Sequence, residues 1–243
     1  LVFECNTPAV DGATPSAFSA HALARSQEKN ISNDQLNSDI DLIWGAESES
    51  INKENTAANG YTYIGSETEL NALTVGSKSF AQFNFDDLKY VTNDYDTPTI
   101  EEMTTKAIEI LSADEDGFFL MVEGGKIDYA CHANDAAAAL HETVDFDNAI
   151  RVAYEFYKQH PKETLIVISA DHETGGFTLG NGSYELRFGA LQAQKVSQAG
   201  FSRIVNRMRH ETKDNVTWEQ MKDALKENLG FWDTVQLRER DEQ

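Results

Sequence analysis

Two short segments of the sequence combine carboxylate and imidazole side chains. One is EGGKIDYACH, residues 123–132, and the other is ADHETGG, residues 170–176. Carboxylate and imidazole groups together suit Zn²⁺, whereas carboxylate and hydroxyl oxygens suit Mg²⁺. Asp128 and His132 are four residues apart, so a helical turn would place both on one face. Either segment alone also fits a capping carboxylate beside a surface histidine; the two together favour a metal site, with capping as the alternative.

Each of these segments follows an apolar run of strand length. Residues 118–122 (FFLMV) and 164–169 (TLIVIS) indicate buried strands, and the stretch 135–160 between them indicates a helix that Pro161 ends. A strand, a helix and a strand in this order predict a βαβ unit, and therefore an α/β fold with a parallel sheet. Ligands of a doubly wound sheet bind beyond the carboxyl ends of its strands, where both segments would lie.

The rest of the chain supplies further helices and a strand. Thr14-Pro15 and Thr97-Pro98 are each predicted as the N-cap and first residue of a helix, the first running to about Arg25 and the second to Leu111. Residues 40–44 (IDLIW) indicate a short buried strand. Three acids of helix 135–160 are expected to form a solvated face: Glu142, Asp145 and Asp147.

The character of the sequence changes after Gly180. Residues 184–205 and 218–229 indicate helices joined by connectors. We therefore divide the chain into an α/β core, residues 1–182, and a helical insertion subdomain, residues 183–243. The expected core is a doubly wound, largely parallel sheet with helices on both faces.

Composition limits the classes of function. The 243 residues correspond to one large domain, or to one domain with an insertion. A formal net charge of −21 argues against binding to nucleic acid or to an anionic membrane surface. No apolar run reaches the ~18 residues of a membrane-spanning helix. The two cysteines, Cys5 and Cys131, are too few for a disulfide scaffold, and their spacing leaves open whether they pair.

Four stretches resemble the alkaline phosphatase family. They are the segment 10–25, beginning VDGATPSAF, then GFFLMVEGGKIDYACH (117–132), ALHETVDFDNAI (139–150) and LIVISADHETGG (165–176). The stretches also follow one another in the order that the family has. The resemblance implies hydrolysis of phosphate monoesters through a phosphoserine intermediate, at a site with two zinc ions and one magnesium ion.

The resemblance also assigns residues to this site. Arg25 matches the arginine that grips the substrate phosphate, a role that suits a planar guanidinium. Tyr129 follows Asp128 and could contact phosphate through a water molecule; packing on the loop is the alternative. The implied metal ligands are Asp128 and His132 for the first zinc, Asp171 and His172 for the second, and Glu123 and Thr14 for magnesium.

Parts of the family's site are expected to be missing from this chain. The nucleophilic serine and a bridging aspartate precede the segment that matches Thr14 to Arg25, and the thirteen residues before Thr14 hold no candidate. The first zinc also takes a histidine from a later strand, where residues 183–243 offer only His210, in a predicted helix with basic neighbours. His210 is expected to be a surface residue. We therefore expect an incomplete sheet and little or no turnover by this chain alone.

The sequence is compatible with three functions. The leading one is a metal-dependent phosphomonoesterase, which Arg25 and Glu123 favour over a phosphodiesterase or sulfatase-like hydrolase. The third is a non-catalytic domain that binds metal or phosphate. The resemblance further implies phosphate monoester substrates, a homodimer or other homo-oligomer, and a periplasmic or secreted location.

Overall fold

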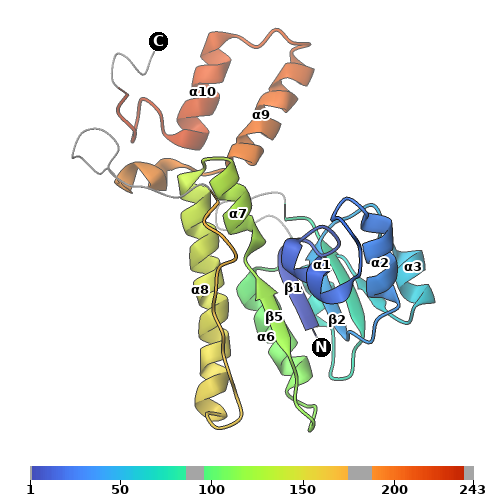
Figure 1. The fold of residues 1–243 in the computed structure, drawn as a ribbon. Helices are drawn as coiled ribbons and strands as arrows, with labels where there is room; N and C mark the ends of the chain where they lie inside the picture. Colours follow the sequence, from blue (N-terminus) through green and yellow to red (C-terminus); the bar gives the residue numbers. More distant parts are fainter. Residues whose placement is uncertain (1, 86–95, 175–187, 238–243) are drawn as a thin grey trace. The chain divides into compact units, whose positions relative to one another are not determined.

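The computed structural model describes residues 2–85, 96–174 and 188–237 (Figure 1). These residues form two compact units. The first, called here the sheet unit, comprises residues 2–85, 96–126 and 142–169. The second, called the helical unit, comprises residues 127–141, 170–174 and 188–237. The expected domain boundary at 182/183 falls outside the described residues.

The sheet unit is built on five parallel strands. They are β1 (Val2–Pro8), β2 (Leu42–Ala46), β3 (Thr62–Ile64), β4 (Ser79–Phe83) and β5 (Leu120–Glu123), in the spatial order β3-β4-β2-β1-β5. Val2 pairs with Leu42 of β2 on one side and with Leu120 of β5 on the other. The strand order therefore reverses at β1, and the parallel α/β fold expected from the sequence is confirmed.

Alternate residues of the strands face opposite sides of the sheet, and each side has its own core. Leu42 and Trp44 of β2 belong to a cluster that includes Met103 of helix α6 (Ile100–Leu111). Ile43, between them, belongs to a second cluster that includes Ile31 of helix α2 (Glu28–Leu36). The sheet is therefore covered on both faces, as Figure 1 shows for α2 and α6. Shorter helices flank it: α1 (Ala13–Ser19), α3 (Lys53–Ala58) and α4 (Glu67–Asn71).

Two helix starts differ from their predicted positions. Helix α6 begins after Thr99, whose hydroxyl accepts a hydrogen bond from the Glu102 amide while the Glu102 carboxylate accepts one from the Thr99 amide. This reciprocal capping box satisfies two end groups, which a cap at Thr97 would not do. Helix α1 has Gly12 as its N-cap without a side-chain bond, and it ends at Ser19, well before Arg25.

The predicted strand 164–169 is wrong. These residues form neither helix nor strand, and Leu165 and Val167 are 86% and 77% exposed. A strand is stable only where a neighbouring strand pairs with its backbone groups. None of the described strands pairs with this run, although its composition is that of a buried strand.

The helical unit contains the end of α7 (Gly125–His132), the start of α8 (Ala136–Gln159), a 3₁₀-helix η1 (Phe188–Ala193), α9 (Gln198–Glu211) and α10 (Trp218–Leu229). The predictions for α8 and α10 are confirmed. Of the predicted helix 184–205, residues 184–187 lie outside the described residues, and the rest forms η1 and the start of α9, which has Ser197 as its N-cap. In the part of the chain that the structure describes, no helix is long and apolar enough to cross a membrane.

Candidate metal centre

The two carboxylate–imidazole pairs of the sequence lie in the helical unit. Helix α7 places His132 one turn after Asp128, with His132 Nε2 3.5 Å from Asp128 Oδ1. In the second pair, His172 Nε2 lies 3.4 Å from Asp171 Oδ2. Bonds of about 2.0–2.1 Å in a tetrahedral zinc site put neighbouring ligand atoms about 3.3 Å apart. Each pair therefore has the donor types and the spacing of two ligands on one zinc ion.

Thr174 connects the two pairs. Its hydroxyl donates a hydrogen bond to Asp128 Oδ1 and lies 3.0 Å from His172 Nδ1. The backbone amide of His172 also donates to Asp171 Oδ1, at 3.1 Å. Residues from α7 and from the segment after residue 169 thus form one continuous polar cluster. We call His132, Asp128, Thr174, His172 and Asp171 the bridged cluster.

Each carboxylate–imidazole pair of the bridged cluster has two side chains of the types that bind zinc. In residues 2–85, 96–174 and 188–237, no three His, Cys, Asp or Glu side chains gather closely enough to hold one metal ion. The donors present fit zinc in type and spacing, and each pair would need further ligands for a four-coordinate site.

Three other predicted site residues lie in the sheet unit. Glu123 ends β5 and Thr14 lies in the first turn of α1, and both side chains are half-buried. Arg25 is exposed, and its Nη1 donates a hydrogen bond to the carbonyl of Asp11 at 3.2 Å, just ahead of α1. Glu123 is the last residue of β5, and Thr14 and Arg25 follow the adjacent strand β1. A doubly wound sheet binds its ligands beyond the carboxyl ends of its strands.

The carboxyl end of β1 also presents a buried hydroxyl. Thr7 Oγ1 is buried and has no hydrogen-bond partner in the part of the chain that the structure describes. A Cβ on Gly125 would lie 2.6 Å from that oxygen, so only glycine lets α7 start so close to β1. Hydroxyl and carboxylate oxygens are hard ligands of the kind that Mg²⁺ takes, and the oxygens at this end of the sheet fit that ion.

The remaining predicted residues are two exposed side chains and two free cysteines. Tyr129 is exposed on α7, and His210 is exposed in the last turn of α9. Cys5 and Cys131 are both free, and Cys5 is buried beside its strand partner Glu123. Burial and the nearby carboxylate raise the pKa of the Cys5 thiol, so Cys5 is not a thiolate nucleophile.

The expected solvated face on helix 135–160 is wrong for two of its three acids. Glu142 and Asp145 are buried, and only Asp147 is exposed. Asn6 Nδ2 donates to Glu142 Oε2 at 2.9 Å, while the backbone amide of Lys126 donates to Asn6 Oδ1 at 2.9 Å. Burial raises the pKa of Glu142 to about 7, although Lys126 opposes the rise.

The helical period could have identified these acids. Glu142 and Asp145 continue the face of α8 that carries Ala138 and Ala149, at spacings of three and four residues. Their polar character concealed that pattern. Each has the partner that a buried carboxylate needs: Asn6 for Glu142, and the backbone amide of Ile100 for Asp145, at 3.2 Å.

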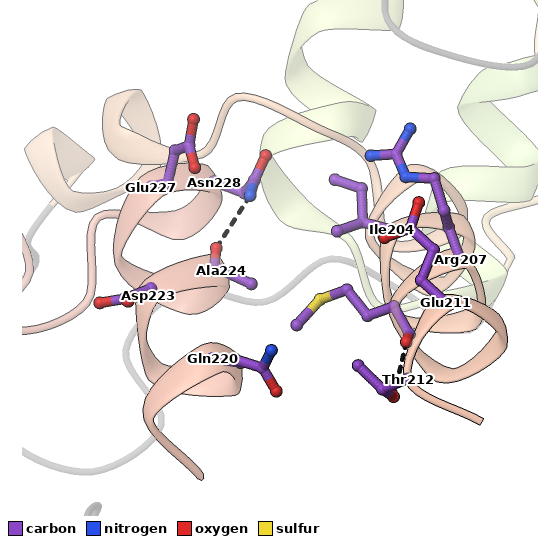
Figure 2. Close-up of a pocket in the computed structure, with 10 residues that line it drawn as sticks. Ile204, Arg207, Glu211, Thr212, Gln220, Asp223, Ala224, Glu227 and Asn228 are labelled. Atoms are coloured by element: carbon purple, nitrogen blue, oxygen red, sulfur yellow. Dashed lines mark hydrogen bonds between the residues drawn. The ribbon is translucent and has the colours of Figure 1, made fainter. Parts of the chain in front are cut away.

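A groove between α9 and α10 is separate from the bridged cluster (Figure 2). Its centre is apolar, with Ile204, Met208 and Ala224. Two of its polar groups, Thr212 Oγ1 and Asn228 Nδ2, donate to carbonyls of their own helices at 2.8 and 2.9 Å. None of the predicted site residues lines this groove.

Comparisons with known proteins agree with these motifs. The family model described as alkaline phosphatase matches residues 45–232. Alkaline phosphatase 4 of Bacillus subtilis is 35% identical over 189 residues, which are 72% of this chain and 40% of that protein. The chain therefore spans less than half the length of this curated relative.

Solved structures agree as well. The cold-active alkaline phosphatase of a Shewanella species superposes with a TM-score of 0.77 at 32% identity, over 95% of this chain and 56% of that one. The Thermus thermophilus alkaline phosphatase has a TM-score of 0.77 at 22% identity, over 94% and 50% of the two chains, and supports the fold alone. Because the family model matches more than half of this chain, the chain belongs to the alkaline phosphatase family.

Proposed function

We propose that this chain provides metal ligands and a phosphate-binding arginine for a metal-dependent phosphomonoesterase. The observation that carries the proposal is the bridged cluster, in which two carboxylate–imidazole pairs have the spacing of zinc ligands. Family membership supports a phosphatase-type hydrolase. We propose phosphate monoester hydrolysis for a protein of the relatives' length, because this chain spans only 40% of the relative from Bacillus subtilis.

Each group has a separate task in this proposal. Asp128 with His132, and Asp171 with His172, would each hold a zinc ion, while Glu123 and Thr14 would provide oxygens to magnesium. Such ions stabilise the attacking and leaving oxygens of a phosphoryl transfer. Arg25 would grip two phosphate oxygens, because its guanidinium offers parallel N–H donors. Its exposure leaves it open to a substrate in water.

Zinc content after dialysis tests the metal ligands. We expect the purified chain to retain about one zinc ion or more per chain, since each pair supplies two ligands. Asp171→Ala removes one ligand of a pair and should lower zinc binding by more than the ~10- to 100-fold that loss of an outer-shell partner costs, as measured by competition with a chromophoric chelator. His210→Ala, which removes an exposed histidine on α9, is the matched control and should bind zinc like the parent chain. Equal losses in both variants would contradict the assignment.

The substrate class needs a second experiment. Hydrolysis of an aryl phosphate, a bis-aryl phosphate and an aryl sulfate should be compared on the protein extended to the length of its relatives, loaded with zinc and magnesium. The proposal expects preference for the monoester, and Arg25→Met should reduce it. Preference for the diester or the sulfate would favour a phosphodiesterase or sulfatase-like hydrolase, and zinc binding without hydrolysis would favour a binding domain.

Two further statements belong to the same proposal. We propose that the protein self-associates as a homodimer or higher homo-oligomer, which sedimentation velocity would detect. We also propose that it functions in the periplasm or after secretion, which fractionation of the producing cells would test.

A further inference from the structure

Thr174 has a backbone conformation that is unusual for its residue type. Its φ is +50°, in the left-handed region. A β-branched side chain is rarely found there, because its branches crowd the backbone. Such residues persist where surrounding interactions hold them, and they are concentrated at functional sites. Among the described residues, the Thr174 hydroxyl contacts Asp128 and His172, both members of the bridged cluster.

The protons in this cluster can be counted. A threonine hydroxyl has one proton to donate, and an ionised carboxylate only accepts. The hydroxyl donates that proton to Asp128. Toward His172 Nδ1, 3.0 Å away, the same oxygen can therefore only accept, so the proton of the neutral imidazole must be on Nδ1.

This proton placement determines which ring nitrogen can bind a metal. With Nδ1 protonated, the lone pair of His172 is on Nε2, the nitrogen that lies 3.4 Å from Asp171 Oδ2. The Nε2 lone pair of His172 thus lies beside a carboxylate oxygen of the same proposed zinc pair. The same hydroxyl occupies one oxygen of Asp128, in the other pair. A hydrogen-bond partner of this kind orients a ligand and fixes its tautomer.

We propose that Thr174 is a positioning residue that sets the tautomer of His172 and the orientation of the Asp128 carboxylate, and so couples the two zinc pairs. This inference rests on the proposed function, because it treats both residues as zinc ligands. The alternative is a local turn contact between Thr174 and His172 that has no effect on either ligand.

Three variants separate these possibilities. Thr174→Val keeps the branched shape but removes the hydroxyl, whereas Thr174→Ser keeps the hydroxyl. Thr62→Val, on the exposed side of β3, is the matched control for loss of a threonine hydroxyl. Circular dichroism first establishes that each variant is folded.

The first readout needs no metal. Two-bond ¹H–¹⁵N spectra of the zinc-free chain at about pH 8, where an ordinary histidine is neutral, report which ring nitrogen carries the proton. His172→Gln identifies the signal. We expect a single Nδ1–H tautomer in the parent chain and in Thr174→Ser, and a tautomer mixture in Thr174→Val. An unchanged tautomer in Thr174→Val would overturn the inference.

The second readout is zinc affinity, measured with Zn²⁺ and a competing chelator. Thr174→Val should lose about 10- to 100-fold in affinity, and Thr174→Ser and Thr62→Val should stay close to the parent. Equal affinity in Thr174→Val and the parent would also overturn the inference. If the parent itself binds no zinc, the proposed metal site is wrong, and the tautomer spectra then decide the role of Thr174 alone.

Discussion

Glu4 lies in the central strand β1 with its side chain fully buried. Thr104 of α6 donates a hydrogen bond to Glu4 Oε1, whereas Oε2 has no hydrogen-bond partner among the described residues. Burial raises the pKa of Glu4 to about 8, and the bond from Thr104 only partly opposes this. The folded protein therefore holds a neutral carboxyl group in the middle of its sheet at neutral pH.

This pKa makes stability depend on pH. Glu4 keeps its proton in the folded state up to about pH 8, while the unfolded chain loses it near the ordinary value of 4.5. Stability from this group is complete below pH 4.5 and is lost as the pH rises to about 8. We predict that Glu4→Gln, which never ionises, gains stability relative to the parent as the pH is raised. Urea unfolding at several pH values measures the difference.

The control for this prediction is Glu115→Gln, at an exposed acid between α6 and β5. The added amide NH₂ of Glu4→Gln lacks an acceptor among the described residues, and this lowers the free energy of unfolding by an amount that does not vary with pH. The prediction therefore concerns the slope of the difference with pH. If the stability difference from the parent changes with pH equally in Glu4→Gln and Glu115→Gln, then Glu4 has the same pKa in the folded and unfolded states.

At the scale of elements, side-chain caps define the starts of three helices. Thr99, Ser197 and Thr217 each accept a hydrogen bond from an amide of the first turn. Thr99 and Thr217 also form capping boxes, with Glu102 and Gln220. These local bonds stabilise a helix terminus independently of distant packing.

The start of α6 offers a direct test between two neighbouring threonines. We predict that Thr99→Ala lowers the free energy of unfolding by about 1 kcal/mol, because it removes the N-cap side chain. Thr97→Ala removes only a bond from its hydroxyl to the carbonyl of Asn84, at 3.1 Å, and should cost less. Urea midpoints of the two variants provide the comparison. A greater loss in Thr97→Ala would place the N-cap where the Thr-Pro pattern predicted it.

Local signals explain which elements were predictable from the sequence. Helices α8 and α10 carry clear periodicity and end signals, Pro161 after α8 and Gly230 after α10. The strand run 164–169 has equally clear composition, but a strand depends on a partner that its own residues do not specify. Glu142 and Asp145 were misjudged for a related reason. Their burial depends on Asn6 and Ile100, which are far away in the chain.

The candidate site was predictable in part. Residue type and spacing indicated a metal site, with capping as the alternative, and the family resemblance paired the residues as zinc ligands. In the structure the imidazole–carboxylate distances of the two pairs are 3.5 and 3.4 Å. The positioning role that we propose for Thr174 could not be predicted from the sequence, because it rests on a contact with Asp128, 46 residues earlier. Such a contact requires the fold.

At the scale of the molecule, one buried carboxylate connects separate segments of the helical unit by hydrogen bonds. Asp135 precedes α8, and its Oδ1 accepts from the amide of Ala138 and from Gln194 Nε2, at 3.0 and 2.7 Å. Its Oδ2 accepts from the amide of Gln198, at 2.6 Å. A single side chain thus ties the start of α8 to the start of α9.

Removal of this carboxylate should loosen the helical unit selectively. We predict that Asp135→Ala speeds hydrogen exchange in residues 188–211, because three donors, from Ala138, Gln194 and Gln198, lose their acceptor. Exchange in α6, in the sheet unit, should be unchanged. Asp147→Ala, at an exposed acid within α8, is the control. Equal protection in both variants would mean that Asp135 does not hold the unit together.

The position of β1 in the sheet also has a consequence for biosynthesis. Val2 pairs with Leu42 and with Leu120, which follow it by 40 and 118 residues. At about 5–20 residues per second on the ribosome, the β5 side of β1 stays uncovered for roughly 6–24 s after β1 is made. An uncovered strand edge is a template for pairing with another chain. Nascent copies are therefore most prone to associate on polysomes during this interval, and slower translation lengthens it.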